Sequence, residues 1–232
     1  MINLVFLCLL LAVNSGLANY DEKKEPEVPS GRIAYLTIDD GPSEEVTVQL
    51  LDILQEQGVK ATFFVLPHEG VGHIYERILA EGHAMGNHSY SHDYQRLYGD
   101  DDGAFFREDV ERAEAWLIER FEHQTDLFRF PGGSKSWDPA RIVRRKEILE
   151  ELGYRVFDWD ASNGDTTPMP ESKDPNALVA NVMSRIEGRD RLIVLMHDTK
   201  SKQATADALP ELIAKLRAEG YGFDTLANYE AL

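Results

Sequence analysis

From residue 33 onward, short apolar runs alternate with longer amphipathic stretches. The apolar runs, rich in β-branched and aromatic residues, predict strands at 33–38, 61–66, 83–87, 127–130, 154–159 and 192–196, with a weaker one at 223–226. Apolar residues at helical spacing predict intervening helices at 46–57, 74–80, 104–122, 139–152, 175–187 and 204–218. This alternation predicts right-handed crossovers and a parallel sheet covered by helices.

Two α/β architectures fit this pattern. One is a distorted parallel (β/α) barrel with about seven strands, and the other is a doubly wound open sheet. We favour the barrel because the polar candidate residues follow many strands and do not gather at one crevice. No glycine-rich dinucleotide fingerprint follows any predicted strand.

The N-terminal region differs from the rest of the chain. Residues 1–18 contain a short apolar core at 4–13 and small residues before a cleavage point after Ala18, which predicts a signal peptide and an exported protein. No Lys or Arg precedes the apolar core, so an uncleaved anchor is the alternative. Residues 19–31 are polar and contain Pro26 and Pro29, as expected of a linker or N-terminal arm. Residues 32–232 are then the folded domain.

The composition limits the classes of molecule that this protein is expected to bind. The formal net charge of −17 argues against nucleic acid and against an anionic membrane surface, because both require clustered Lys and Arg. A neutral or cationic substrate fits better. The single cysteine, Cys8, lies in the predicted signal peptide, so the mature chain has no disulfide and, with the apolar core removed, no membrane span. We expect a monomer.

Two adjacent carboxylates, Asp39 and Asp40, lie where the first predicted strand ends, and Gly41-Pro42 follows them with turn chemistry. In α/β proteins ligands bind at this edge of the sheet. The alternative is that the two aspartates only cap the turn and the next helix.

A pair of histidines, His88 and His92, follows the third predicted strand. Four residues apart, they would lie on one side of a helical turn, close enough to share an ion. With one Asp they would form a facial triad that leaves positions open for water and substrate. The alternative is a chance pair on a surface helix.

Two further candidates end later strands. Arg129 would face the polar mouth of the barrel, where a guanidinium can keep a carboxylate ionised. His197 follows four apolar residues and is placed to be a general acid, with a buried core histidine as the alternative. The other histidines are expected to be structural or exposed; they are His68, His73, His83 and His123.

From Arg32 to the C-terminus the chain resembles the polysaccharide deacetylase (NodB-homology) family of carbohydrate esterases. The resemblance rests on five segments in order, namely Thr37 to Pro42, His88-Ser-x-x-His92, Arg129-x-Pro131, Trp159 to Asp165, and Leu195-Met-His197. Two positions depart from the family pattern: Gly132 replaces the usual Tyr, and Thr166 the usual Trp. These departures concern the walls of the substrate groove.

The resemblance implies a metal-dependent hydrolase with a divalent ion held by Asp40, His88 and His92. The ion is expected to be Zn²⁺, with Co²⁺ as the alternative. It implies an acetylated polysaccharide as substrate, namely an N-acetylglucosamine polymer such as peptidoglycan or chitin oligomers. An acetylxylan-type O-deacetylase is the alternative.

The resemblance also assigns catalytic roles. Asp39 would be the general base, kept ionised by Arg129. His197 would be the general acid, with Asp165 orienting its ring, although Asp158 and Asp160 are rivals for that role. The backbone N–H of Gly132 would help to stabilise the oxyanion.

Three other functions remain as alternatives. A glycoside hydrolase would use paired carboxylates but leaves the two histidines unexplained. A serine esterase lacks the Gly-x-Ser-x-Gly elbow, because the segment 132–136 ends without the last glycine. A non-catalytic carbohydrate-binding protein on the same fold would be expected to have lost the base or the acid, and both Asp39 and His197 are present.

Overall fold

The computed structural model describes residues 31–230. The predicted signal peptide (1–18) and nearly all of the predicted arm (19–31) lie outside these residues. Among the described helices, none combines the length and the apolar character needed to cross a bilayer.

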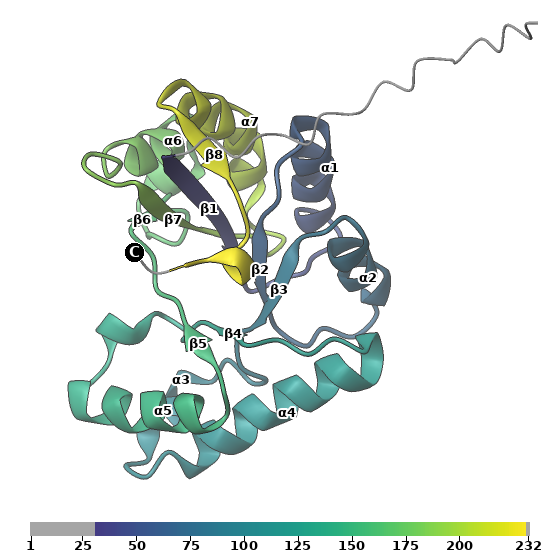
Figure 1. The fold of residues 1–232 in the computed structure, drawn as a ribbon, viewed down its shortest axis with the longest axis vertical. Coiled ribbons are helices and arrows are strands. Elements are labelled where there is room, and N and C mark those ends of the chain that lie inside the picture. Colours follow the sequence, from purple (N-terminus) through teal and green to yellow (C-terminus); the bar gives the residue numbers. More distant parts are fainter. Residues whose placement is uncertain (1–30, 231–232) are drawn as a thin grey trace, which may run out of the picture.

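All strand pairs in the sheet are parallel, as predicted. The strands are β1 (Arg32–Asp39), β2 (Thr62–Val65), β3 (Ala84–Asn87), β4 (Leu127–Phe128), β5 (Arg155–Val156), β6 (Ala161–Ser162), β7 (Arg191–His197) and β8 (Tyr221–Phe223). Their order is β5-β4-β3-β2-β1-β7-β6, with β8 paired to β1. The sheet curls, but its ends β5 and β6 do not pair among the described residues, so the barrel stays open along one seam (Figure 1).

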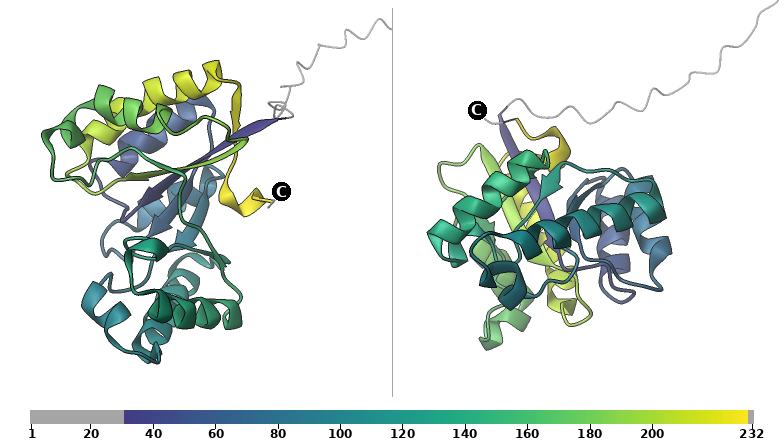
Figure 2. Two further views of the ribbon diagram at one scale, coloured as in Figure 1. Left: turned by 90° about the vertical axis from the view of Figure 1, so that its left-hand side faces the viewer. Right: turned by 90° about the horizontal axis from the view of Figure 1, so that it is seen from below.

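Helices cover the outside of the curled sheet (Figures 1 and 2). They are α1 (Thr47–Gln57), α2 (Gly72–Ala80), α3 (Tyr94–Gly99), α4 (Ala104–Phe121), α5 (Pro139–Glu151), α6 (Pro175–Met183) and α7 (Gln203–Ala218), with short 3₁₀ turns η1 (Ser134–Ser136), η2 (Pro170–Lys173) and η3 (Leu226–Asn228). Helices α6 and α7 lie beside β7 and β8, whereas α3, α4 and α5 form a second layer below β4 and β5 (Figure 1). The distorted parallel barrel is confirmed.

The longest strands, β1 and β7, are neighbours at the centre of the sheet, and their register places Asp39 opposite His197. Burial explains why these segments are strands: Leu36, Val194 and the other apolar residues of both strands lie in the core. Because the strands are parallel, both end at the same edge of the sheet. Two of the predicted catalytic residues are therefore neighbours.

The predicted strand limits were least accurate near the seam. The runs 127–130 and 154–159 were predicted as full strands, but β4 and β5 contain two residues each. Beyond β4, the Arg129 side chain turns inward and Pro131 lacks the N–H that a ladder needs. Strand β6 and helix α3 were not predicted, because neither is long enough to show a hydrophobic period.

Candidate active site

Three predicted metal ligands meet at the carboxyl edge of the sheet. Asp40, His88 and His92 each offer one ligand atom, and these atoms lie within 4.8 Å of one another. Oδ1 of Asp40 is 3.4 Å from Nε2 of His88 and 3.3 Å from Nε2 of His92. Two atoms each about 2.0–2.1 Å from a zinc ion in tetrahedral geometry would be separated by about 3.3 Å. The spacing therefore fits a divalent ion.

The chemistry of the ligand atoms also fits a cation. Oδ1 of Asp40 is buried and has no hydrogen-bond partner among the described residues, which is costly without an ion. The carbonyl oxygen of Arg129 lies 2.9 Å from Nδ1 of His88. Because a carbonyl only accepts, Nδ1 carries the proton and the lone pair of Nε2 faces Asp40. This tautomer is the one that binds a metal.

The two histidines do not lie on a helical turn, so that expectation was wrong. Residues 88–93 form a loop before α3, with positive φ at Ser89 (79°) and His92 (50°). The buried carboxylate of Asp109 holds this loop by accepting the backbone N–H of Tyr90 at 2.7 Å and of Ser91 at 3.1 Å. The imidazoles converge because a side chain from α4 fixes the loop.

The backbone of Asp40 is in the left-handed region, with φ of 78°. Three hydrogen bonds hold it there: the Asp40 N–H donates to the Phe64 carbonyl at 3.3 Å, the Leu66 N–H donates to the Gly41 carbonyl at 3.0 Å, and Nε2 of His68 lies 2.9 Å from the Asp40 carbonyl. His68 was expected to be merely structural or exposed, and its contact with Asp40, a predicted metal ligand, was not predicted. No local motif marks it, because the contact depends on how two loops pack.

The Asp40 carboxylate is ionised. Its burial would raise the pKa, but the adjacent side chains of His88 and His92, together with the charge of His88 and His197, hold the pKa of Asp40 well below its usual range. A carboxylate that stays charged next to two imidazoles is a suitable ligand for a cation.

Asp39, the last residue of β1, lines the same cavity as Asp40 and binds Arg129. Oδ1 of Asp39 accepts a hydrogen bond from Nη1 of Arg129 at 2.9 Å, while Oδ2 lies 3.8 Å from Nε2 of His88. The guanidinium is fully buried and also donates to Thr37 Oγ1 at 2.6 Å and to the carbonyls of Phe157 and Asp158. One oxygen of Asp39 is therefore fixed, and the other faces the metal ligands.

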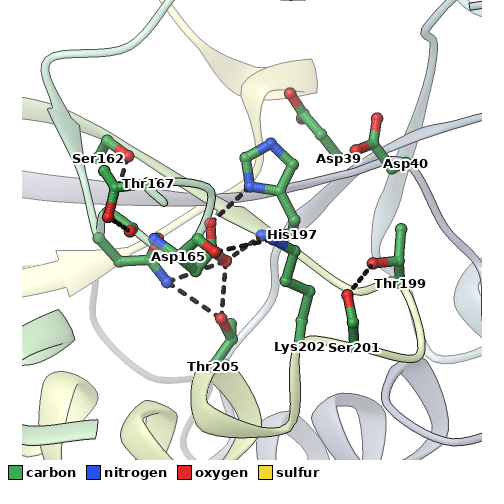
Figure 3. Close-up of polar contacts among 12 residues, drawn as sticks. Asp39, Asp40, Ser162, Asp165, Thr167, His197, Thr199, Ser201, Lys202 and Thr205 are labelled. Atoms are coloured by element: carbon green, nitrogen blue, oxygen red, sulfur yellow. Dashed lines mark hydrogen bonds and ion pairs between the residues drawn. The ribbon is translucent and has the colours of Figure 1, made fainter. Parts of the chain in front are cut away.

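His197 pairs with Asp165. The Nδ1–H of His197 donates to Oδ1 of Asp165 at 2.8 Å, and its backbone N–H donates to Oδ2 at 2.9 Å. The rivals have other partners: Asp158 accepts from Ser134, and Asp160 accepts from Arg189. Figure 3 shows the imidazole between Asp165 on one side and the two aspartates Asp39 and Asp40 on the other.

The pairing changes both pKa values. Burial alone would lower the pKa of His197, but the hydrogen bond and charge of Asp165, with smaller effects of Asp39 and Asp40, raise it above its ordinary value. Burial would raise the pKa of Asp165, but His197 and the Thr205 hydroxyl lower it. The pairing therefore favours the protonated form of His197 and the ionised form of Asp165.

A fourth aspartate near the site, Asp198, was not predicted. It is buried, accepts a hydrogen bond from Thr47 Oγ1 at 2.6 Å, and its backbone N–H donates to the Asp39 carbonyl at 3.3 Å. A Cβ at position 41 would overlap its carboxylate, so Gly41 is required there. Burial raises the pKa of Asp198 to about 7.

The site opens into a cavity of about 220 Å³. Its walls include Asp39, Asp40, His88, His92, Tyr94, Gly132, Trp159, Ser162, Thr166, Leu195 and His197. The structure thus brings the predicted ligands, base and acid, together with Gly132, around one space; Arg129 and Asp165 lie behind Asp39 and His197.

Comparison with known proteins agrees with this arrangement. The family model described as polysaccharide deacetylase matches residues 27–157. The peptidoglycan-N-acetylglucosamine deacetylase PgdA of Listeria monocytogenes is 32% identical over 88% of this chain, which spans only 40% of that relative. The catalytic domain of a peptidoglycan N-acetylglucosamine deacetylase from Eubacterium rectale superposes with a TM-score of 0.78, at 31% identity over 88% of this chain and 92% of that one.

Not every structure with this fold is described as active. A pseudoenzyme of the CE4 family from Bacillus anthracis superposes with a TM-score of 0.70, at 25% identity over 86% of this chain and 65% of that one. The fold alone therefore does not establish turnover, and the residues of the site have to support it. The match to the family model covers more than half of the sequence, and the chain belongs to the polysaccharide deacetylase family.

Proposed function

We propose that this chain is a metal-dependent hydrolase that removes the acetyl group from N-acetylglucosamine residues of a polysaccharide. The observation that carries the proposal is the position of Asp40 Oδ1. This atom has no hydrogen-bond partner among residues 31–230 and lies 3.4 and 3.3 Å from two histidine nitrogens. Asp39 and His197 end neighbouring strands at the same edge of the sheet. A binding protein would not need an ion site flanked by both a base and an acid.

Asp40, His88 and His92 would hold the divalent ion, for which we propose Zn²⁺ with Co²⁺ as the alternative. When bound, such an ion polarises the acetyl carbonyl and lowers the pKa of water, which makes hydrolysis feasible at neutral pH. The remaining steps are assigned to the side chains around the cavity.

Asp39 is the proposed general base. Arg129 fixes one of its oxygens at 2.9 Å, which orients the other oxygen toward the space in front of the ligands. From that position the carboxylate can take the proton of the attacking water as oxygen adds to the carbonyl carbon. The N–H of Gly132 is the proposed donor to the oxyanion, because Gly132 lines the same cavity.

His197 is the proposed general acid. Asp165 binds its Nδ1, so the proton on Nε2 is available to the departing nitrogen. The charge of Asp165 raises the pKa of His197, which favours retention of this proton until it is transferred. Transfer to the nitrogen accompanies cleavage of the carbon–nitrogen bond and releases an amine and acetate.

The test is acetate release from N-acetylglucosamine oligomers, peptidoglycan and acetylated xylan. Activity should disappear on chelation and return with Zn²⁺ or Co²⁺. Asp39→Asn should keep the metal but lose most turnover, whereas His88→Ala should lose the metal. Release that is insensitive to chelation would exclude the mechanism, and loss of the metal from Asp39→Asn would reverse the assignment of base and ligand. Polysaccharide binding without acetate release from any substrate would instead support a non-catalytic protein.

We also propose that the protein acts outside the cytoplasm as one catalytic domain, residues 32–232. The apolar segment 4–13 and a wall polymer as substrate support export. Cell fractionation, with mass spectrometry of the mature N-terminus, tests this directly: a chain that still begins at residue 1 would exclude cleavage after Ala18.

A further inference from the structure

Residues 130–133 form a β-turn beside the active-site cavity. The N–H of Gly133 donates to the carbonyl of Phe130 at 2.8 Å and closes the turn. Pro131 and Gly132 occupy its two central positions, and Gly132 has a φ of 75°. A proline at the first central position and a positive φ at the second identify a type II turn. Gly132 is the residue of this turn that lines the active-site cavity.

The peptide between Pro131 and Gly132 determines where the Gly132 N–H points. Type I and type II turns differ by a rotation of this central peptide by roughly half a turn, which reverses the directions of its C=O and N–H bonds. Proline at the first central position is compatible with both types, and glycine at the second accepts either sign of φ. The local sequence therefore leaves the direction of the N–H open.

Two aromatic side chains hold the carbonyl of this peptide. The Tyr98 hydroxyl donates to the Pro131 carbonyl at 2.9 Å, and Nε1–H of Trp137 donates to the same oxygen at 3.1 Å. The two rings stack, with centroids 4.0 Å apart and planes 17° apart. Among residues 31–230 neither donor has another acceptor, and Tyr98 is buried. Rotation of the peptide would leave both donors without a partner, which is costly for buried groups.

The Gly132 N–H must then point away from the two rings, because the C=O and N–H bonds of a trans peptide are antiparallel. Gly132 lines the active-site cavity, whereas Tyr98 and Trp137 are not among the residues that line it. Within the described part of the chain the Gly132 N–H has no hydrogen-bond partner. This donor is therefore available to a ligand in the cavity.

We infer, on the basis of the deacetylase function proposed above, that Tyr98 and Trp137 are positioning residues for the oxyanion donor. By binding the Pro131 carbonyl they select the type II turn, in which the Gly132 N–H faces the acetyl group. Their hydrogen bonds also polarise the peptide, which makes its N–H a stronger donor. Glycine has no side chain to restrict its own conformation, so the preorganisation that catalysis requires comes from these two rings.

The test variant is Tyr98→Phe/Trp137→Phe, which keeps two aromatic rings and removes both donors. The control is Tyr221→Phe. Tyr221 is also buried and its hydroxyl also donates to a backbone carbonyl, at 2.7 Å, but it lies beside Arg32 at the opposite end of β1 from the site.

A second variant, Gly132→Ala, acts on the same turn without touching either ring donor. A Cβ at position 132 would meet no atom closer than 3.5 Å, so there is space for it, but alanine disfavours the positive φ and with it the type II turn.

Three quantities are measured for each variant. Acetate release from N-acetylglucosamine oligomers gives kcat and KM, and elemental analysis gives the metal content. The nitrogen chemical shift of the Gly132 amide, measured by NMR, reports hydrogen bonding to the carbonyl of its own peptide and does not depend on turnover.

Complete removal of an oxyanion donor costs about 10²–10³ in kcat, and a donor that is loosened but still present should cost about tenfold. The double variant should show this tenfold loss with KM and metal content nearly unchanged, because the donor acts on charge that develops only in the transition state. Its Gly132 resonance should move, whereas Tyr221→Phe should keep the wild-type kcat and resonance. Gly132→Ala should lose a similar factor, and combining it with the double variant should add little, because all three changes act on one peptide.

A rise in KM without a fall in kcat, a fully multiplicative loss in the combined variant, or a Gly132 resonance that the double variant leaves in place would overturn the positioning role. Wild-type protein that releases no acetate from any substrate would refute the proposed function instead. A Gly132 resonance that then still moved in the double variant alone would support the hold of the two rings on the turn.

Discussion

Replacing Asp165 by Asn removes one charge from the Asp165–His197 pair and changes the shape of the side chain very little. The carboxylate accepts four hydrogen bonds: one at Oδ1 from His197 Nδ1, at 2.8 Å, and three at Oδ2, from the His197 N–H at 2.9 Å, Thr205 at 2.7 Å and Asn163 at 3.2 Å. An amide has one acceptor oxygen, and three donors require it on the Oδ2 side. The NH₂ group must then face His197 Nδ1.

This orientation disfavours the protonated imidazole, because two donors would oppose each other. A hydrogen bond to a charged group contributes about 1.5–3 kcal/mol, and its loss corresponds to about one to two pKa units. The pKa of His197 should therefore fall by at least about one unit in Asp165→Asn. Near neutral pH the fraction of His197 able to donate a proton, and with it kcat/KM, should fall about 10- to 100-fold.

The assay is a pH–rate profile of acetate release, together with an NMR titration of the His197 ring assigned through His197→Gln. The alkaline limb of kcat/KM should move to lower pH in Asp165→Asn. Thr205→Val is the matched control, since it removes one donor to Oδ2 but keeps the charge, and its limb should remain close to the wild-type position. Metal content should be unchanged in both variants. An alkaline limb at the wild-type pH in Asp165→Asn would refute His197 as an acid supported by Asp165.

Three further predictions concern stability. Arg129→Met should lower the free energy of unfolding by about 3–5 kcal/mol in urea titrations, because it leaves the buried Asp39 without its cation. A smaller loss of stability in Arg129→Met than in Arg129→Lys would contradict this. Asp198→Asn should be more stable than wild type above pH 7, by up to about 4 kcal/mol, and this difference should vanish below pH 4. The reason is that folding raises the pKa of Asp198 from 3.8 to about 7. The protonated carboxyl group is compatible with burial at low pH, and this contribution to stability is lost as the pH rises through 7. The Asp165–His197 pair should contribute most to the free energy of unfolding between pH 4 and 6.5. Asp165, with its lowered pKa, loses its contribution as the pH falls below this range, and His197, with its raised pKa, loses its contribution as the pH rises above it. A stability difference between wild type and Asp165→Asn that stays constant from pH 3 to 9 in thermal unfolding would disprove this.

The accuracy of the fold prediction followed the length of each hydrophobic pattern. The run 33–38 and the periodic stretch 104–122 correspond to β1 and α4 to within one residue or two, because each shows its period several times over. Strands β5 and β6 have two residues each and show no period. They are strands only because β4 and β7 lie beside them, which is information about tertiary structure.

The structure brings the predicted metal ligands together, but not through the local geometry that the sequence analysis expected. His88 and His92 were paired through the four-residue spacing of a helix, yet they lie in a loop. The shape of that loop depends on Asp109, which is 18 and 19 positions from the residues that it binds. The spacing drew attention to the pair and the family resemblance implied its role as ligands, but the helical turn that the spacing assumed is absent. Asp198 was not predicted because the property that distinguishes it is its burial against Gly41, and burial cannot be inferred from the residue type.

The proposed roles of Asp39 as base and Asp40 as metal ligand depend on one backbone angle. Alternation along a strand would by itself send adjacent side chains to opposite faces. Asp40, however, has left the strand: its φ of 78° turns the carboxylate toward the two imidazoles, while Asp39 keeps the extended geometry of β1 and meets Arg129. A residue other than glycine in this region costs about 1–3 kcal/mol, and the hydrogen bond of the Asp40 carbonyl with His68 helps to offset that cost. His68→Ala should therefore weaken metal binding more than it weakens the fold, because the first effect of releasing the carbonyl is to let Asp40 relax out of the ligand geometry.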